Sequence, residues 1–171
     1  MPKQSPTVGA YFFADDYIKF IQKLRYYITL EIKFITAKYA RHREAIIRNG
    51  NLNCPIGVLD DVEIIFVHYK DANLVREKWN RRIERINWDN LIFKFSYMND
   101  CTQTELRTFD EMELPGKKIM FVNTRDFAFK CGVYYPGFEN ERQIYNDTFY
   151  YDKYFDIFTF INEGRIIAKN I

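Results

Sequence analysis

Between residues 62 and 122 the sequence alternates three short apolar runs with two segments of helical periodicity. The runs are Val62–Tyr69 (VEIIFVHY), Leu91–Tyr97 (LIFKFSY) and Lys118–Val122 (KIMFV). The first run has the length and β-branched content of a strand that is buried on both faces. Strands that alternate with helices are joined by right-handed crossovers and lie parallel. The pattern therefore predicts a three-layer α/β/α fold with a mostly parallel, Rossmann-like sheet, in which these three strands are neighbours.

A helix is expected from Ala72 to Ile86, where apolar side chains recur on one face. The pattern predicts that the side chains of Val75, Trp79, Ile83 and Ile86 are buried and that those of Lys78, Arg81 and Arg85 are exposed. A second helix is expected to begin at Thr102, because Thr102 and Glu105 have the spacing of a capping box and an apolar stripe follows them.

The remaining segments carry weaker patterns, and residues 31–57 are expected to be irregular. The other predicted elements are a strand at Val8–Phe13, a helix with an apolar stripe from Tyr17 to Ile28, a strand at Gly132–Tyr135, an exposed loop at Glu139–Thr148, and a last helix that is stopped by Gly164. A chain of 171 residues with 47% hydrophobic residues can bury one core of ordinary size. Residues 1–171 are therefore predicted to form a single α/β domain.

Composition excludes several functional classes. The 25 basic and 23 acidic residues leave a net charge of +2, which is too balanced for the broad positive field of a nucleic-acid-binding protein. Three cysteines without CxxC spacing and only two histidines argue against disulfides and a structural zinc site, and the sequence leaves the cofactor unknown. The N-terminus lacks the apolar stretch of an export signal, and no apolar run approaches the roughly 20 residues of a membrane span. We therefore expect a cytoplasmic protein without an integral membrane segment.

In an open parallel sheet, ligands bind beyond the carboxyl ends of the strands. The residues that follow the predicted strands there supply the candidate catalytic residues, His68, Lys70 and Asp100, and candidate ligand-binding residues on the same edge or on the adjoining helix, Tyr69, Asn99, Cys101, Thr102 and Arg82. Histidine is suited to proton transfer near neutral pH. On adjacent or next-adjacent strand ends, the side chains of His68 and Asp100 should approach within roughly 12 Å.

Each of these residues also has a structural interpretation. His68 could simply end a strand, Asp100 and Thr102 could cap a helix, and Cys101 could be an inert packing residue. Arg82 could belong to a solvated helix face.

Two further groups of acidic residues are candidates for sites. Asp60, Asp61 and Glu63 form a dense acidic cluster that could bind a metal ion, but they precede the strand Val62–Tyr69 and should lie at the opposite edge of the sheet. Asp15 and Asp16 follow the first predicted strand, so they belong to the carboxyl edge and also suit the positive end of a helix. His42 lies in the charge run Arg41–Glu44 and is interpreted as a surface residue.

Several short stretches, taken together, carry a family resemblance. They are Ser5–Gly9, Phe12-Phe13, Tyr17–Phe20, Pro55–Gly57, Leu59–Ile64, His68–Lys70, Lys78-Trp79, Arg81-Arg82, Ile86–Asn90, Cys101-Thr102 and Tyr135–Phe138. With them the chain resembles, over nearly its whole length, a bacterial family known as domain of unknown function 1919. Members of that family are often labelled exopolysaccharide or capsule biosynthesis proteins. They usually carry an additional N-terminal segment before the Ser-Pro-Thr element, and we expect it to be missing here.

The resemblance implies an α/β/α fold and a role in surface-polysaccharide assembly, and it assigns no catalytic residues. One hypothesis is therefore a transferase that acts on an activated sugar or glycan, with His68, Lys70 and Asp100 near the donor phosphates or the acceptor hydroxyl. The alternative is a non-catalytic module that binds glycan or protein through aromatic surface, as the 16 Phe and 13 Tyr residues suggest. No nucleotide-binding or hydrolase motif decides between the two.

Overall fold

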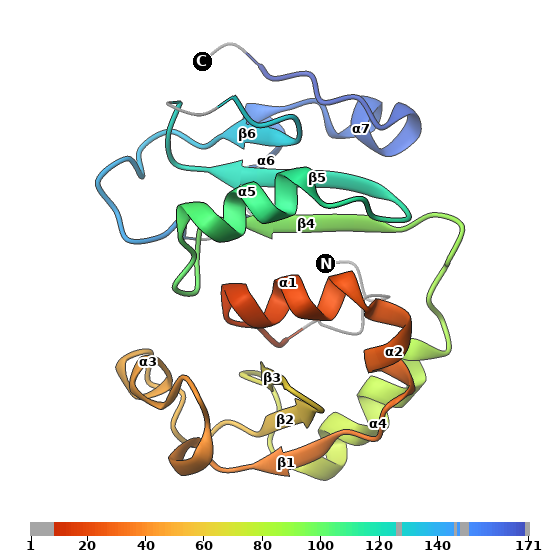
Figure 1. Cartoon of the computed structure of the whole chain (residues 1–171), viewed down its shortest axis with the longest axis vertical. Helices are drawn as coiled ribbons and strands as arrows, with labels where there is room; N and C mark the ends of the chain where they lie inside the picture. The colour runs from red at the N-terminus through yellow and green to blue at the C-terminus, as the bar shows by residue number, and fades with distance from the viewer. Residues whose placement is uncertain (1–8, 126–127, 146, 148–150, 170–171) are drawn as a thin grey trace. The chain divides into compact units, whose positions relative to one another are not determined.

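The chain has a mixed α/β structure that divides into two compact units, Met1–Trp88 and Asp89–Ile171 (Figure 1). The structure is a computed structural model, and it describes residues 9–125, 128–145, 147 and 151–169. We call the two parts unit 1 and unit 2 and describe each by itself. The single domain expected over residues 1–171 stays a prediction.

Unit 1 combines helices with a three-stranded antiparallel sheet of order β1-β2-β3. Its elements in chain order are α1 (Ala14–Gln22), α2 (Leu24–Thr29), β1 (Lys33–Ile35), the short 3-10 helix η1 (Ala37–Tyr39), α3 (Arg43–Arg48), β2 (Ile56–Leu59), β3 (Val62–Ile65) and α4 (Ala72–Ile83). Residues 31–57 are therefore more regular than the sequence predicts. The helix expected from Tyr17 to Ile28 is divided at Lys23, whose backbone leaves the helical region at φ −123° and ψ 40°.

Strands β2 and β3 form a tight hairpin. Leu59 pairs with Val62, so only Asp60 and Asp61 form the connection. Asp60 has a φ of 56°, a left-handed conformation that aspartate tolerates better than most residues and that two-residue hairpin loops require. The prediction that Val62–Tyr69 lies in one parallel sheet with Leu91–Tyr97 and Lys118–Val122 is wrong, because this turn folds β3 back against β2 in an antiparallel pair.

The sheet of unit 1 packs against an apolar core. The core residues, all buried, are Phe13, Ala37, Ala40, Ala45, Ile46, Ile56 and Ile65. Tyr11 exchanges two backbone hydrogen bonds of 2.9 Å with Ile65, and this is the part of the expected strand Val8–Phe13 that forms a β-bridge; Val8 itself lies outside the described residues. This bridge places the beginning of α1 next to β3.

Helix α4 confirms in part the helix that is predicted from Ala72 to Ile86. Asp71 caps it by accepting a hydrogen bond from the backbone N–H of Leu74 at 2.9 Å. The helix ends at Ile83, three residues earlier than expected. The predicted core residues Val75 and Trp79 are buried and Ile83 and Ile86 are half-buried, whereas Arg81 and Arg85 are exposed and Lys78 is half-buried.

Unit 2 contains the parallel sheet that the alternating pattern predicts, with the order β4-β5-β6. Its elements in chain order are β4 (Ile92–Ser96), α5 (Gln103–Glu111), β5 (Lys117–Val122), β6 (Gly132–Tyr134), α6 (Tyr151–Tyr154) and α7 (Ile157–Glu163). The capping box of Thr102 and Glu105 is present, and Gly164 closes α7 with a φ of 74°. Parallel pairing of β4 with β5 is therefore confirmed, although the wider Rossmann-like sheet with β3 is not formed.

The two faces of β5 are occupied by different helices. Lys118 donates to the carbonyl oxygens of Phe109, Asp110 and Met112 at the end of α5, while Phe121 packs in the apolar cluster that includes Phe160 of α7. The loop expected at Glu139–Thr148 is exposed only in part. Ile144 and Asp147 are buried, and Asn146 and Thr148 lie outside the described residues.

Candidate functional site

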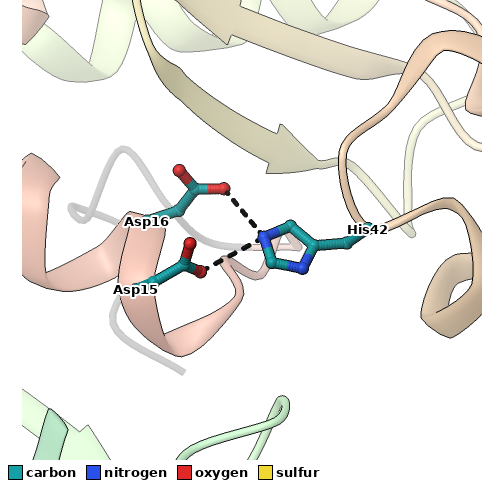
Figure 2. A group of neighbouring side chains, drawn as sticks. All are labelled: Asp15, Asp16 and His42. Atoms are coloured by element: carbon teal, nitrogen blue, oxygen red, sulfur yellow. Dashed lines mark ion pairs between the residues drawn. The ribbon is translucent and has the colours of Figure 1, made fainter. Parts of the chain in front are cut away.

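Two carboxylates and one imidazole converge in unit 1 (Figure 2). Asp15 and Asp16, on the first turn of α1, both point toward Nε2 of His42. This nitrogen lies 3.2 Å from Oδ1 of Asp15 and 3.7 Å from Oδ2 of Asp16. We call these three residues the Asp-Asp-His cluster.

Local structure brings His42 close to Asp16, although 26 positions separate the two residues in the sequence. The bridge between Tyr11 and Ile65 fixes the start of α1, and His42 immediately precedes α3. The imidazole of His42 stacks on the ring of Phe13, with 4.0 Å between the ring centroids and 18° between the planes. Because Phe13 also directly precedes α1, the same ring orients the histidine and joins it to the segment that carries the aspartates.

Arg41 and Glu63 support the cluster from one side. Both carboxylate oxygens of Glu63, on β3, accept the backbone N–H of Arg41 at 3.1 Å. The guanidinium of Arg41 in turn donates a hydrogen bond to Oδ1 of Asp16. The other oxygen of Asp16, Oδ2, is buried and has no hydrogen-bond partner among the described residues. Oδ1 of Asp16 is therefore paired with Arg41, whereas Oδ2 lies 3.7 Å from His42 without forming a hydrogen bond among the described residues.

The side chains in and beside the cluster range from fully buried to partly exposed. The Asp16 side chain is 0% exposed, whereas the side chains of His42, Arg41 and Asp15 are 23%, 41% and 44% exposed. A small molecule or ion can therefore approach from the side of Asp15, and the buried carboxylate lies directly behind it.

Burial and neighbouring charge shift the acidities of the cluster in different directions. Desolvation raises the pKa of Asp16 to about 6, against the opposing effect of Arg41. The Asp15 carboxylate raises the pKa of His42, and the interaction with His42 lowers the pKa of Asp15. Asp16 thus changes protonation close to neutral pH, as is typical of groups in functional sites.

Two of the three residues of this cluster stand out in the sequence. Asp15 and Asp16 directly follow a predicted strand, but the charged residues around His42 predict a surface position for it. The contact of His42 with the two aspartates depends on the position of α3 relative to α1. The spacing of residues along the sequence does not indicate that position. The available signal was weak: an Asp-Asp pair directly after a buried aromatic run, at the start of a helix.

Four of the predicted site residues lie in unit 1, outside the Asp-Asp-His cluster. His68 and Lys70 are exposed. Tyr69 and Arg82 are brought together: the Arg82 guanidinium donates to the Tyr69 hydroxyl. Because β3 belongs to an antiparallel hairpin, the argument that placed His68 at the carboxyl edge of a parallel sheet does not hold.

The other four predicted residues lie in unit 2 between β4 and α5. Asn99 and Asp100 have φ values of 56° and 58°, and the backbone N–H of Asn99 donates to Gln143 Oε1 at 3.2 Å. Thr102 caps α5, which confirms its structural interpretation. Burial raises the pKa of the Cys101 thiol, which disfavours a nucleophilic thiolate. The approach of His68 to Asp100 and a pocket shared by the two groups stay predictions.

The acidic residues around the β2–β3 turn point to separate partners. Asp60 accepts a hydrogen bond from the hydroxyl of Tyr26 at 2.9 Å, Asp61 accepts one from Tyr27 at 2.6 Å, and Glu63 binds Arg41. A groove of about 530 Å³ elsewhere in unit 1 is lined by residues that include Arg76, Asn80 and Glu84. Glu63 is thus linked to the Asp-Asp-His cluster through Arg41, whereas the hydrogen bonds of Asp60 and Asp61 and the lining of the groove involve other residues.

Comparison with known proteins identifies the family of the chain. The model of the family described as "Domain of unknown function (DUF1919)" matches residues 1–162. The chain belongs to the DUF1919 family. A sequence from Haemophilus influenzae, described as "Uncharacterized protein", is 28% identical over 165 residues, which cover 94% of this chain and 73% of the relative. In the described part of this DUF1919 chain, no helix is both long and apolar enough to cross a membrane.

Proposed function

We propose that this DUF1919 chain is a transferase of surface-polysaccharide assembly, and that the Asp-Asp-His cluster is its reaction centre. The proposed substrate is a sugar activated by a phosphate group, and the acceptor is a hydroxyl of a glycan. The proposed place of the reaction is the cytoplasm. The family resemblance supports the pathway, and the geometry of the cluster supports the chemistry.

The buried carboxylate of Asp16 is the observation that carries the proposal. Buried charged groups that serve stability alone are normally paired and fully hydrogen-bonded, because an uncompensated one costs several kcal/mol, on the order of 3–5. Asp16 has one oxygen without a hydrogen-bond partner among the described residues, and that oxygen faces His42. A fold that retains such a group beside an accessible edge has the arrangement of a reaction centre.

Sugar transfer makes two demands that the cluster can meet. The acceptor oxygen forms a bond to the anomeric carbon, the bond from that carbon to the phosphate oxygen breaks, and the phosphate leaves with the electron pair. A base must take the proton of the acceptor hydroxyl, and positive charge must stabilise the leaving phosphate. The carboxylates of Asp15 and Asp16 can serve the first demand. The guanidinium of Arg41, 41% exposed beside Asp16, suits the second.

Donor binding and donor breakdown test the proposal. We would measure the unfolding temperature with UDP-, GDP- and CMP-activated sugars, each with and without Mn²⁺, because a ligand specific for the native state raises it. We would also measure nucleotide release with water or glycan as acceptor. One donor class should stabilise the wild type and be turned over, and Asp16→Asn should abolish turnover while the protein stays folded.

Asp60→Asn is the matched control. It makes the same chemical change on an exposed residue of unit 1 whose contact is with Tyr26. It should keep the turnover of the wild type. The proposal fails if none of these donors is bound or broken down, or if Asp16→Asn is as active as Asp60→Asn.

A further inference from the structure

We propose that Asp15, Asp16 and His42 together bind one divalent transition-metal ion. The sequence predicts no metal site, so the proposal rests on the geometry, burial and charge of the cluster. It extends the proposed function by naming the cofactor of the same site.

The spacing of the three ligand atoms matches a shared ion. Carboxylate oxygens and imidazole nitrogens bind such ions at about 2.0–2.2 Å, so ligand atoms at angles between octahedral and tetrahedral lie about 3.0–3.5 Å apart. Nε2 of His42 lies 3.2 Å from Asp15 Oδ1 and 3.7 Å from Asp16 Oδ2. All three ligand atoms lie within 4.8 Å of one another. The two distances from His42 Nε2 are therefore within a few tenths of an ångström of those around one ion.

Two buried atoms point into the cluster without a hydrogen-bond partner among the described residues. They are Oδ2 of Asp16, on a side chain that is 0% exposed, and Nε2 of His42. Buried polar atoms normally have hydrogen-bond partners, and a bound ion is one of the standard explanations when they do not. The same two atoms are proposed ligands, so one cation would satisfy both.

Charge balance favours a divalent cation. When ionised, Asp15, Asp16 and Glu63 carry three negative charges, and Arg41 supplies one positive charge. A metal-bound histidine is neutral, so the group retains an excess of two negative charges. One divalent ion neutralises it.

The ligand types indicate which ion is bound. Imidazole with carboxylate suits first-row transition metals such as Mn²⁺ and Zn²⁺, whereas Mg²⁺ and Ca²⁺ prefer oxygen ligands alone. Three protein ligands leave positions open for substrate, as in catalytic metal sites. The half-exposed Asp15 lies on the side from which a donor phosphate can reach the ion. A bound acceptor hydroxyl would lose its proton more readily there, and Asp15 keeps a second carboxylate oxygen to receive it.

Metal binding is measured on the free full-length chain, without any donor. Mn²⁺ would be titrated by electron paramagnetic resonance, which counts the unbound ion, and Zn²⁺ and Mg²⁺ by calorimetry. The variants are Asp15→Asn and Asp16→Asn, with Asp60→Asn as the control. Because Asp15 is partly exposed, its variant should fold even if Asp16→Asn does not. Fluorescence of the chain's two tryptophans, Trp79 and Trp88, both in unit 1, checks folding.

The proposal predicts one saturable Mn²⁺ or Zn²⁺ site per chain, with weaker binding of Mg²⁺. Asp15→Asn should weaken binding at least about tenfold, since even partners of metal ligands contribute that much, and Asp60→Asn should leave it unchanged. Folded wild type without saturable binding would overturn the proposal, as would equal affinity of Asp15→Asn and Asp60→Asn. Metal binding without any donor turnover would support the ion and count against the transferase. Turnover that persists undiminished in excess EDTA would support the transferase and count against the ion.

Discussion

Asp16 should make the metal-free protein less stable as the pH rises. Burial raises the pKa of Asp16 from its ordinary value of 3.8 to about 6. A carboxyl group with a higher pKa in the folded state holds its proton more tightly there, so its contribution is most favourable below pH 3.8. That contribution is lost as the pH rises through about 6 and is constant above it. A difference of about two pKa units at about 1.4 kcal/mol each corresponds to a loss of about 3 kcal/mol.

Other groups that face Asp16 also titrate, so a variant must isolate its effect. The raised pKa of His42 favours folding below its unfolded value and loses that effect as the pH rises, which adds to the slope of Asp16. The lowered pKa of Asp15 favours folding above pH 3.8, so its effect on the slope is opposite to that of Asp16. Arg41 stays charged throughout. Asp16→Asn removes only the titration of Asp16 and its coupling to these neighbours.

Urea unfolding in EDTA between pH 4 and 8, followed by tryptophan fluorescence, reports unit 1, where both tryptophans lie. The free energy of unfolding should fall by up to about 3 kcal/mol more in the wild type than in Asp16→Asn over this range. Curves that stay parallel across the whole range would refute the reasoning, because Asp16 would then have an ordinary pKa in the folded state.

Three further predictions concern the fold. Gly57→Ala should destabilise unit 1 by about 1–3 kcal/mol, since the added Cβ would lie 2.4 Å from Ile32 Cδ1. In urea unfolding, the double variant Gly57→Ala/Ile32→Val should lose less stability than the sum of the two single variants. Thr102→Ala should cost about 1 kcal/mol through loss of the α5 cap, measured as a lower denaturation midpoint by circular dichroism; an unchanged midpoint would argue against the cap. Burial raises the pKa of Cys131 to about 12, so iodoacetamide at pH 8 should label Cys131 only after unfolding, and fast labelling of the native chain would contradict its burial.

Local patterns predicted elements better than their arrangement. The run at Lys118–Val122 and the capping box at Thr102 specify their own structures, because periodicity and capping depend on nearby residues. The sequence does not predict the partner of β3, because Asp60-Asp61 has the pattern of an acidic cluster but forms a two-residue turn. An apolar run predicts a buried strand, but the turn that precedes it decides whether the strand lies parallel or antiparallel to its neighbour.

The candidate site shows the same limit. Asp15 and Asp16 could be singled out from their place after an aromatic run, but the role of His42 depends on its stacking against Phe13. That contact joins two segments whose relative position only the folded structure defines. In contrast, His68 was selected by a rule for parallel sheets that does not apply to the strand it follows.

The central claim is that Asp15, Asp16 and His42 act as one metal-binding centre. Crystals grown with Mn²⁺, with anomalous diffraction data collected near the manganese edge, test it most directly. The account predicts an anomalous peak about 2.1–2.3 Å from Asp15 Oδ1, Asp16 Oδ2 and His42 Nε2, within the range of such bonds. An ordered cluster with no peak at this position, in crystals that bind manganese elsewhere, would contradict it.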